Sequence, residues 1–181
     1  YWGTNVVRNL MASDKTNLIA VCDAAAGRST AAKKLYPEIE TSSDYSVYLD
    51  DPRVDAFSLA IQTEPSYVIA MEIMKKGKHL FIEKPIATTA ERAEKLTQTA
   101  LERGLILHCD HIMIYHPIIQ SIKAMYDSGE LGELLYFDVS RMNLGPIRMD
   151  VNAMLDLAVH DLAIIDYLTN DKNQEKLYKD V

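Results

Sequence analysis

Lys78-His79-Leu80-Phe81-Ile82-Glu83-Lys84-Pro85 is the stretch around which this chain is organised. Its three central residues form a short apolar run between a glycine and a proline, which is typical of a parallel strand covered on both faces. Ligands of open α/β sheets bind just outside the carboxyl ends of the strands. The pair Glu83-Lys84 therefore stands where a binding site is expected, although adjacent Glu and Lys residues are more often simply solvated.

Strands and helices alternate along the first 110 residues. Besides the opening stretch, apolar runs predict strands at 18–22, 39–41, 54–61 and 105–109, and the helical pattern predicts helices at 3–11, 27–36, 65–76 and 89–104. Alternation of this kind is typical of βαβ units in an α/β protein. Right-handed crossovers then predict a Rossmann-like, doubly wound parallel sheet.

The pattern changes near His116-Pro117, where a second domain is expected to begin. The sequence predicts a helix to Tyr126, a turn at 128–132, an alternating strand at 134–142 and a helix from about 150 to 168. A long alternating strand after a βαβ array favours an antiparallel sheet. We therefore expect two domains, at 1–110 and 111–181, with the second of α+β type and only begun within this chain.

Composition argues against several classes of function. Of the 181 residues, 48% are hydrophobic, and no apolar run approaches the ~20 residues that a membrane helix needs. The net charge is −7 with both signs mixed along the chain, which argues against nucleic acid or an anionic membrane as the main partner. Cys22 and Cys109 lie in apolar runs, so we expect buried reduced thiols in a cytoplasmic protein rather than a disulfide.

Gly3 and Asp23 resemble the second half of a dinucleotide-binding fingerprint. In that fingerprint the last glycine lets the helix pack closely on the sheet, and an acidic residue about 20 positions later binds the ribose hydroxyls. An acid at this point favours NAD over NADP because it repels the 2′-phosphate, although the nearby Arg28 works against that preference. A glycine before a helix and an acid after a strand also occur by chance in many α/β chains.

Asp156 and His160 are four residues apart on an expected helix, so they share one face. A carboxylate near an imidazole orients the ring and raises its pKa, which suits a general base. A surface Asp–His pair is the ordinary alternative. Their neighbours are apolar on nearly all sides, however, which predicts a buried helix.

His108-Cys109-Asp110-His111 has the composition of a metal site but not the spacing. On a strand, alternate residues point to opposite faces, and no ligand spacing of zinc-site type is present. We therefore expect no metal. His111, at the carboxyl end of its strand, remains a candidate to face a ligand, whereas His79 at the amino end of its strand is expected to be structural. Lower-ranked polar candidates are Tyr115, His116 and Arg148.

Two motifs resemble those of the glucose-fructose oxidoreductase, inositol dehydrogenase and rhizopine catabolism (Gfo/Idh/MocA) family. Gly77-Lys78-His79 with Glu83-Lys84-Pro85 is similar to that family's G-K-H-x-x-x-E-K-P motif, and the segment 156–161 is similar to its D-x-x-x-H-D helix. Tyr1-Trp2-Gly3 resembles the end of its glycine-rich loop, and 128–133 resembles its entry to the second domain. Within the family, 143–145 and 150–152 resemble the UDP-N-acetylglucosaminuronate 3-dehydrogenase branch.

The resemblance implies a role for each matching position. Lys84 would lie beside the nicotinamide and the reacting hydroxyl, His160 would take the hydroxyl proton, and Asp156 would hold the substrate or the imidazole. The implied cofactor contacts are Trp2, Gly3, Asp23, Glu83, Pro85 and His111, with Glu83 supporting Lys84 and Pro85 fixing the turn, for which a cis bond is a candidate. The implied substrate contacts are Lys84, Arg148, Asn152 and His160.

The function implied is hydride transfer between NAD, less favourably NADP, and a secondary hydroxyl of a sugar or nucleotide sugar. A non-catalytic dinucleotide-sensing regulator on the same fold is the alternative, although it would have less need of Lys84 and His160. Ile61-Gln62 and Ser66 depart from the Thr-Pro and His that the family often carries there. Because the first strand is expected to be missing, we expect the 181 residues alone to bind NAD weakly and to be inactive. The resemblance implies a homo-oligomer for a longer chain, because the family usually associates through the sheet of the second domain, most of which is also expected to be missing.

Overall fold

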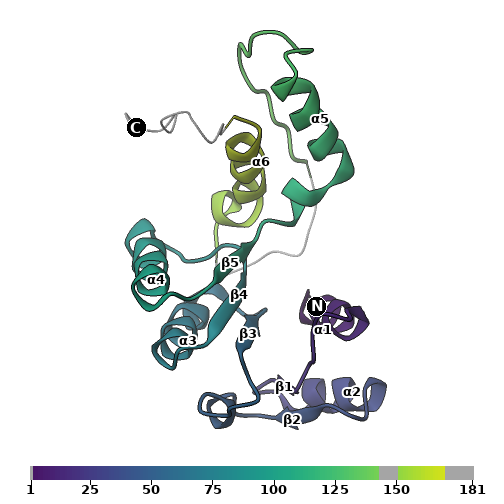
Figure 1. The fold of residues 1–181 in the computed structure, drawn as a ribbon, viewed down its shortest axis with the longest axis vertical. Helices are drawn as coiled ribbons and strands as arrows, with labels where there is room; N and C mark the ends of the chain where they lie inside the picture. Colours follow the sequence, from purple (N-terminus) through teal and green to yellow (C-terminus); the bar gives the residue numbers. More distant parts are fainter. Residues whose placement is uncertain (1, 143–150, 170–181) are drawn as a thin grey trace. The chain divides into compact units, whose positions relative to one another are not determined.

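The computed structural model describes residues 2–142 and 151–169 (Figure 1). The chain divides between Cys109 and Asp110 into two compact units. None of the described helices is long and apolar enough to cross a membrane.

The first unit confirms the predicted alternation of strands and helices. It contains α1 (Trp2–Ala12), β1 (Ala20–Cys22), α2 (Ala26–Leu35), β2 (Glu40–Ser42), the 3₁₀ turn η1 (Ser46–Tyr48), β3 (Ala56–Leu59), α3 (Thr63–Lys75), β4 (His79–Glu83), α4 (Ala90–Arg103) and β5 (Leu107–Asp110). The strands are a few residues shorter than several of the apolar runs that predicted them. The fold class is therefore the predicted α/β class with parallel strands.

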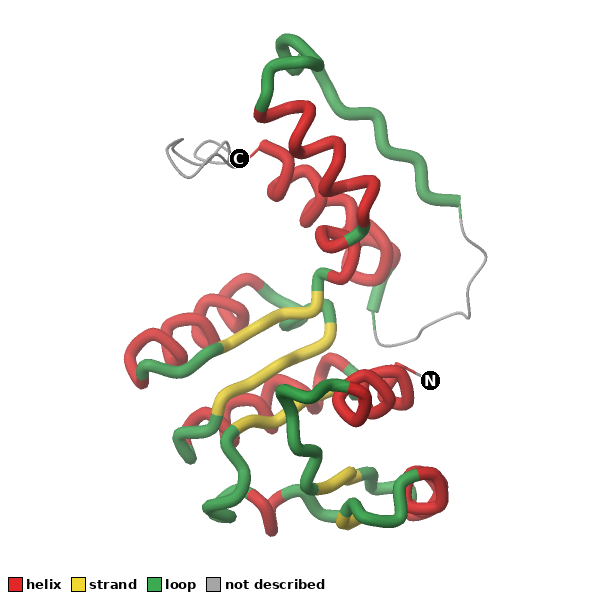
Figure 2. Tube along the Cα trace, turned by 45° about the vertical axis from the view of Figure 1, so that its right-hand side comes forward, coloured by secondary structure: helices red, strands yellow, loops and turns green. Residues whose placement is uncertain are grey.

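The strands form two sheets, one of β1 and β2 and one in the order β3-β4-β5 (Figure 2). β1 pairs with β2 in parallel, and β3 pairs with β4 in parallel with Ala56 opposite His79 and Leu59 opposite Ile82. In a doubly wound sheet one further strand lies between the two halves. Among the described residues no strand occupies that position, so β1 and β3 are not joined.

β4 is the central strand of its sheet and carries the core. Leu80 and Ile82 are 2% and 1% exposed and pack in one cluster with residues of α3 and α4, among them Ile73, Met74 and Leu96. α3 and α4 contact each other on one side of β4 (Figure 1). Phe81 points to the other face, where its ring stacks on His108 with centroids 5.3 Å apart. One face of β4 is therefore buried as predicted, whereas His79, Phe81 and Glu83 on the other face are only half-buried.

The boundaries of α4 follow the signals expected from the sequence. The Thr89 side chain caps its first turn by accepting a hydrogen bond from the Arg92 backbone N–H at 3.4 Å. Gly104 ends the helix in the left-handed conformation with φ +63°. Gly77, with φ +76°, makes the turn between α3 and β4 in the same way.

The amino end of β4 is anchored by Lys78 and His79. The Lys78 ammonium donates to the backbone carbonyls of Asp51 at 2.9 Å and Val54 at 2.6 Å, just before β3. On the other side, His79 Nδ1 accepts from the backbone N–H of Ile106 at 3.0 Å, just before β5. The structural role expected for His79 is therefore confirmed, and Lys78 adds a tie that the sequence did not predict.

The second unit is helical in its described part. It contains the 3₁₀ turn η2 (Ile112–Tyr115), α5 (Pro117–Asp127), the π-helical turn η3 (Met154–Ala158) and α6 (Val159–Thr169). α5 begins as predicted, with His116 as the capping residue and Pro117 in the first turn. Tyr167 Oη on α6 donates to Gln120 Oε1 on α5 at 2.9 Å, which holds the two helices together.

The prediction of a strand at 134–142 is wrong. These residues form neither helix nor strand, and Leu135 and Tyr136 are 80% and 78% exposed. Alternating hydrophobicity allows a strand, but a strand needs a hydrogen-bonded neighbour. In the described part of the second unit no segment pairs with 134–142, so the expected antiparallel sheet is not present there.

Replacing Lys78 with Met should destabilise the protein. The apolar side chain keeps the length of lysine but leaves the two carbonyls before β3 without their donor, and a hydrogen bond to a charged group contributes roughly 1.5–3 kcal/mol. We expect a fall of that order in the free energy of unfolding, measured by urea denaturation. Lys95→Met, at an exposed position of α4, is the matched control, and equal effects of the two substitutions would contradict the anchoring role.

Candidate active site

The carboxyl end of β4 presents the residues that the sequence singled out. Glu83 is the last residue of the strand, and Lys84 follows it, both half-buried. Pro85 is buried, and the Lys84–Pro85 peptide bond is cis, as expected for a proline that fixes a turn. Glu83 Oε1 is shielded from solvent. A glutamate and a lysine thus follow each other at the rim of the sheet, where ligands of this fold bind.

The loop after Pro85 is closed by a polar cluster of Glu64, Tyr67, Thr88 and Arg92, here called the Arg92 clip. Arg92 on α4 donates through Nη1 to the Glu64 carboxylate on α3 and to Thr88 Oγ1 at 3.2 Å. Its guanidinium lies 5.0 Å from the centre of the Tyr67 ring, a cation–π contact. Sequence reasoning missed this cluster, since no local pattern links residues 28 positions apart.

Asp23 lies directly after β1, at its carboxyl end, as predicted. Its Oδ1 accepts from the Ala25 backbone N–H at 2.8 Å, and its Oδ2 lies 3.4 Å from Nη1 of Arg28. The Asp23 side chain is 29% exposed and that of Arg28 is 78% exposed. The carboxylate is therefore held by a turn and is partly exposed beside Arg28, an arrangement that fits the acidic ribose-binding position of a dinucleotide fold.

Gly3 and Trp2 lie in the first turn of α1. A Cβ added at Gly3 would lie 3.8 Å from Ala60 Cβ, just after β3, which is an ordinary van der Waals contact. The packing of this helix therefore does not by itself require glycine, contrary to the reason the fingerprint gives for it. Trp2 is 38% exposed.

The side chains of the segment 108–111 do not lie together: some lie on the faces of β5 and one lies just beyond its end. His108 stacks on Phe81, while His111 follows the strand and precedes η2, with its Nδ1 shielded from solvent. Within residues 2–142 and 151–169 no group of three or more His, Cys, Asp or Glu side chains is arranged to hold a metal ion.

The Cys22 thiol lies at the end of β1. Its pKa is raised mainly by burial and to a lesser extent by the Asp44 carboxylate, which makes the thiol less reactive.

In the second unit Asp156 and His160 lie on one continuous helical segment, both half-buried. The segment is not the regular α-helix that was predicted, because Val159 N–H donates to Met154 O, five residues back. His160 follows at the start of α6, with its Nδ1 shielded from solvent. An apolar run carries no signal for a π turn, so this feature could not be predicted.

Asn152 begins this helix rather than standing apart from it. Its side-chain Oδ1 accepts from the Leu155 backbone N–H at 3.0 Å, and its backbone carbonyl accepts from Asp156 N–H at 2.9 Å. The amide nitrogen of Asn152 is thus the part of the side chain left for a substrate. Arg148 and the branch-specific residues 143–145 and 150 lie outside the described residues.

Residues 1–111 match the family model described as "Oxidoreductase family, NAD-binding Rossmann fold" (Gfo/Idh/MocA). The chain belongs to this family. The Gfo/Idh/MocA model covers β1 to β5 with Glu83, Lys84 and Pro85, and identifies NAD as the cofactor of the fold.

Individual members of the Gfo/Idh/MocA family agree with this assignment. The chain is 33% identical over 117 residues to UDP-N-acetylglucosamine 3-dehydrogenase of Acidithiobacillus ferrooxidans, covering 64% of this chain and 36% of the relative. It is 30% identical over 167 residues to inositol 2-dehydrogenase/D-chiro-inositol 3-dehydrogenase of Lactiplantibacillus plantarum, covering 86% and 45%. The chain therefore spans less than half the length of these two relatives.

A solved structure of a dehydrogenase shares the fold. The WlbA dehydrogenase from Bordetella pertussis, determined with NADH and UDP-GlcNAcA, superposes with a TM-score of 0.78 at 22% identity, covering 93% of this chain and 52% of that chain. At this identity the likeness bears on the fold alone.

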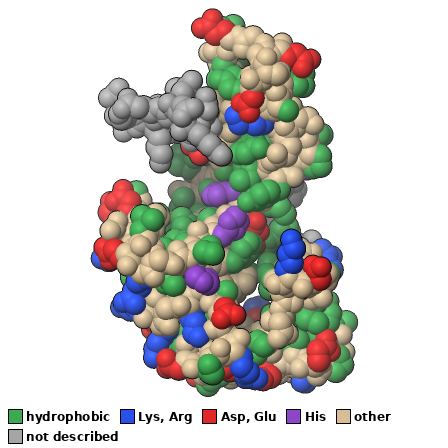
Figure 3. Space-filling view, viewed as in Figure 1, with side chains coloured by type: hydrophobic (Ala, Val, Ile, Leu, Met, Phe, Trp, Pro, Cys, Tyr) green, Lys and Arg blue, Asp and Glu red, His purple; other side chains and the backbone are tan. Residues whose placement is uncertain are grey.

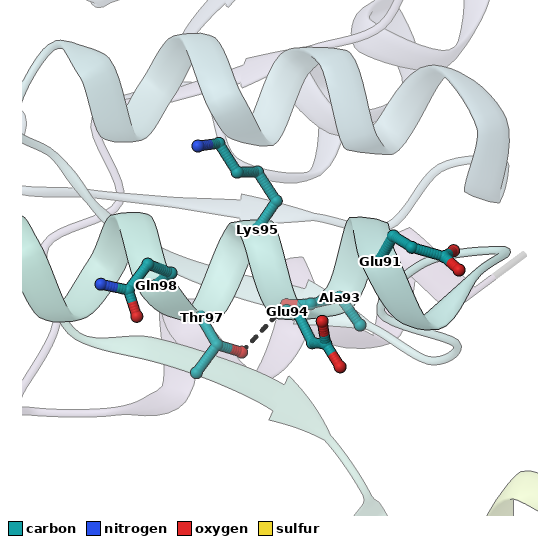
Figure 4. Close-up of a pocket in the computed structure, with 6 residues that line it drawn as sticks. All are labelled: Glu91, Ala93, Glu94, Lys95, Thr97 and Gln98. Carbon is teal, nitrogen blue, oxygen red and sulfur yellow. Dashed lines mark hydrogen bonds between the residues drawn. The ribbon is translucent and has the colours of Figure 1, made fainter.

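One shallow surface hollow lies elsewhere, on α4 (Figure 4). It is lined by residues of that helix alone, namely Glu91, Ala93, Glu94, Lys95, Thr97 and Gln98. Lys95 and Glu94 point to opposite sides of the helix, and Thr97 Oγ1 donates to the carbonyl of Ala93 at 3.0 Å. Because no polar groups converge there, the hollow is not a candidate site. On the face shown in Figure 3 acidic and basic side chains are interspersed over the surface.

Breaking the Arg92 clip should loosen the loop that carries Lys84. Arg92→Gln removes the charge paired with Glu64 and the contact with Tyr67, so the amides of residues 84–89 should exchange faster with deuterium, measured by mass spectrometry. An exposed ion pair alone contributes only about 0–1 kcal/mol, so global stability should change little. Lys95→Gln on the same helix is the control, and identical exchange in both variants would show that the clip does not order this loop.

Proposed function

We propose that the protein is an NAD-dependent dehydrogenase that transfers a hydride between NAD and a secondary hydroxyl of a sugar or nucleotide sugar. The observation that carries the proposal is the Glu83-Lys84-Pro85 turn at the carboxyl end of β4 in a chain of the Gfo/Idh/MocA family. Both relatives described above are dehydrogenases of ring hydroxyls by name.

The proposed chemistry assigns one proton acceptor and one cation. Removing a hydride from a secondary alcohol requires the hydroxyl proton to leave as well, and neutral His160 accepts it. The Lys84 ammonium stabilises the charge that develops on the hydroxyl oxygen. Asp156, one turn before His160, orients the imidazole or the substrate, and Glu83 supports Lys84. Bound NAD supplies the hydride acceptor.

The remaining residues divide between cofactor and substrate in the same proposal. The first unit, at about 1–110, binds NAD with Asp23 on the adenosine ribose and with Trp2, Gly3, Pro85 and His111 as further contacts. The second, from about 111 to 181, binds the sugar through Arg148 and Asn152 and carries the contacts of a homo-oligomer. A cytoplasmic location and the inactivity of the 181 residues alone stay predictions.

Among substrates we favour a UDP-sugar, since the stronger identity is to UDP-N-acetylglucosamine 3-dehydrogenase. Inositols are the competing class, because the longer alignment is to an inositol dehydrogenase. NADH fluorescence on adding NAD with a panel of UDP-sugars or inositols separates the two. A dinucleotide-sensing regulator, the alternative function, would bind NAD but produce no NADH with either panel.

Because the 181 residues alone are expected to be inactive, the test uses a longer protein that contains them, in which Lys84→Ala and His160→Ala should each abolish most of the turnover. Loss of a general base costs on the order of 10²–10⁴-fold, and loss of a charge-stabilising donor costs on the order of 10²–10³-fold. NAD affinity, measured by calorimetry, should persist in the His160 variant, because the residues proposed to hold NAD lie mainly in the first unit. The control is Lys95→Ala, and wild-type turnover in either test variant would refute its assigned role.

A further inference from the structure

Asp161, the last residue of the D-x-x-x-H-D segment, has no role in the mechanism above. It lies on α6 directly after His160, and its carboxylate is bound by the guanidinium of Arg141. Arg141 Nε lies 3.1 Å from both Oδ1 and Oδ2, and Arg141 Nη2 donates to Oδ1 at 2.5 Å. Both carboxylate oxygens are therefore engaged, so Asp161 is not poised to act as the base.

This ion pair has the features of a strong one. Hydrogen bonds between ionised groups are shorter and stronger than neutral ones, and the planar arginine and carboxylate groups can form two or more of them at once. The side chain of Asp161 is only 15% exposed and that of Arg141 only 30%, so solvent screens the pair less than an ordinary surface pair. The hydrogen bonds to Asp161, more than its charge, raise the pKa of Arg141, which keeps the guanidinium charged.

The pair joins the start of α6 to a stretch of chain that lies outside any helix or strand. Arg141 ends the exposed stretch 134–142, which has no helix or strand. On the other side, α6 follows the π turn at 154–158, in which no residue is buried. A π turn is a rare form of helix, and the residues of this one are half-buried or exposed rather than fully buried. Arg141 thus holds the helix from outside, one residue after His160.

We propose that Arg141 and Asp161 are positioning residues for His160. The bidentate pair holds the start of α6 against the stretch 134–142, so that the imidazole keeps its place for proton transfer. The inference rests on the proposed function, in which His160 is the base. Neither Arg141 nor Asp161 touches the reacting atoms in this scheme.

The test compares Arg141→Gln, Arg141→Lys, Asp161→Asn and the double variant in the protein with its sugar substrate. A displacement of about 1 Å at a reacting group costs on the order of 100-fold in rate, so kcat should fall by about that factor in the Gln and Asn variants while the KM for NAD stays unchanged. The lysine of Arg141→Lys keeps the charge but cannot form the bidentate contact, so this variant should retain only part of the wild-type kcat. The double variant should fall no further than the worse single one.

The matched control is the pair Lys123–Asp127, an i,i+4 ion pair within α5 of the same unit, with side chains 16% and 54% exposed. Lys123→Gln and Asp127→Asn should leave kcat unchanged. Unchanged kcat in Arg141→Gln and Asp161→Asn would overturn the inference, as would a parallel loss of NAD affinity, which would indicate general unfolding instead of misplacement of His160.

A second measurement separates this inference from the proposed function. Deuterium exchange at the amides of 153–161 should accelerate in Arg141→Gln and Asp161→Asn but not in the α5 controls. If the wild-type protein turned over no sugar, the proposed function would fail, and the exchange rates would still decide whether the pair holds this helix. Equal exchange in wild type and variants would overturn the inference on its own.

Discussion

The ties at the amino end of β4 are the constraint on which the candidate site depends. Side chains alternate between the two faces of a strand, so a slip of one residue would exchange the buried and the exposed set. Lys78 binds two carbonyls before β3, and His79 binds the backbone before β5, so β4 is held from both neighbouring segments. With that register, Leu80 and Ile82 enter the core, and Glu83 and Lys84 leave the strand at the rim.

The two halves of the G-K-H-x-x-x-E-K-P segment therefore have different roles. Its first half is structural, with a left-handed glycine, a lysine that binds backbone carbonyls, and a histidine that accepts from a backbone amide. Its second half carries the charged pair and the buried proline. The two lysines of the segment have different roles. Lys78 donates hydrogen bonds to backbone carbonyls, whereas Lys84 is proposed to contact a substrate.

The order of strands and helices could be predicted because it depends on local signals. Short apolar runs, the cap at Thr89 and the glycine at 104 each act within a few residues, and the structure confirms them. The strand at 134–142 could not be judged in this way, since alternation describes one strand while a sheet requires two. The Arg92 clip and the Arg141–Asp161 pair join residues 28 and 20 positions apart, and no pattern of spacing marks such partners. Asp23 was placed correctly because the end of a strand is itself a local feature.

The π turn at 154–158 bears on how this helix can vary in length. A π turn advances about 4.4 residues per turn where an α-helix advances 3.6, so it accommodates the equivalent of one inserted residue without interrupting the helix. Removing a single residue from 154–158 would restore regular α-helical winding and keep α6 intact. Because the turn absorbs the extra residue, its removal would leave the rotational phase nearly unchanged between Asn152, which starts the helix, and His160, which lies beyond the turn. The segment 154–158 can therefore lose one residue while the imidazole of His160 keeps its direction relative to the start of the helix.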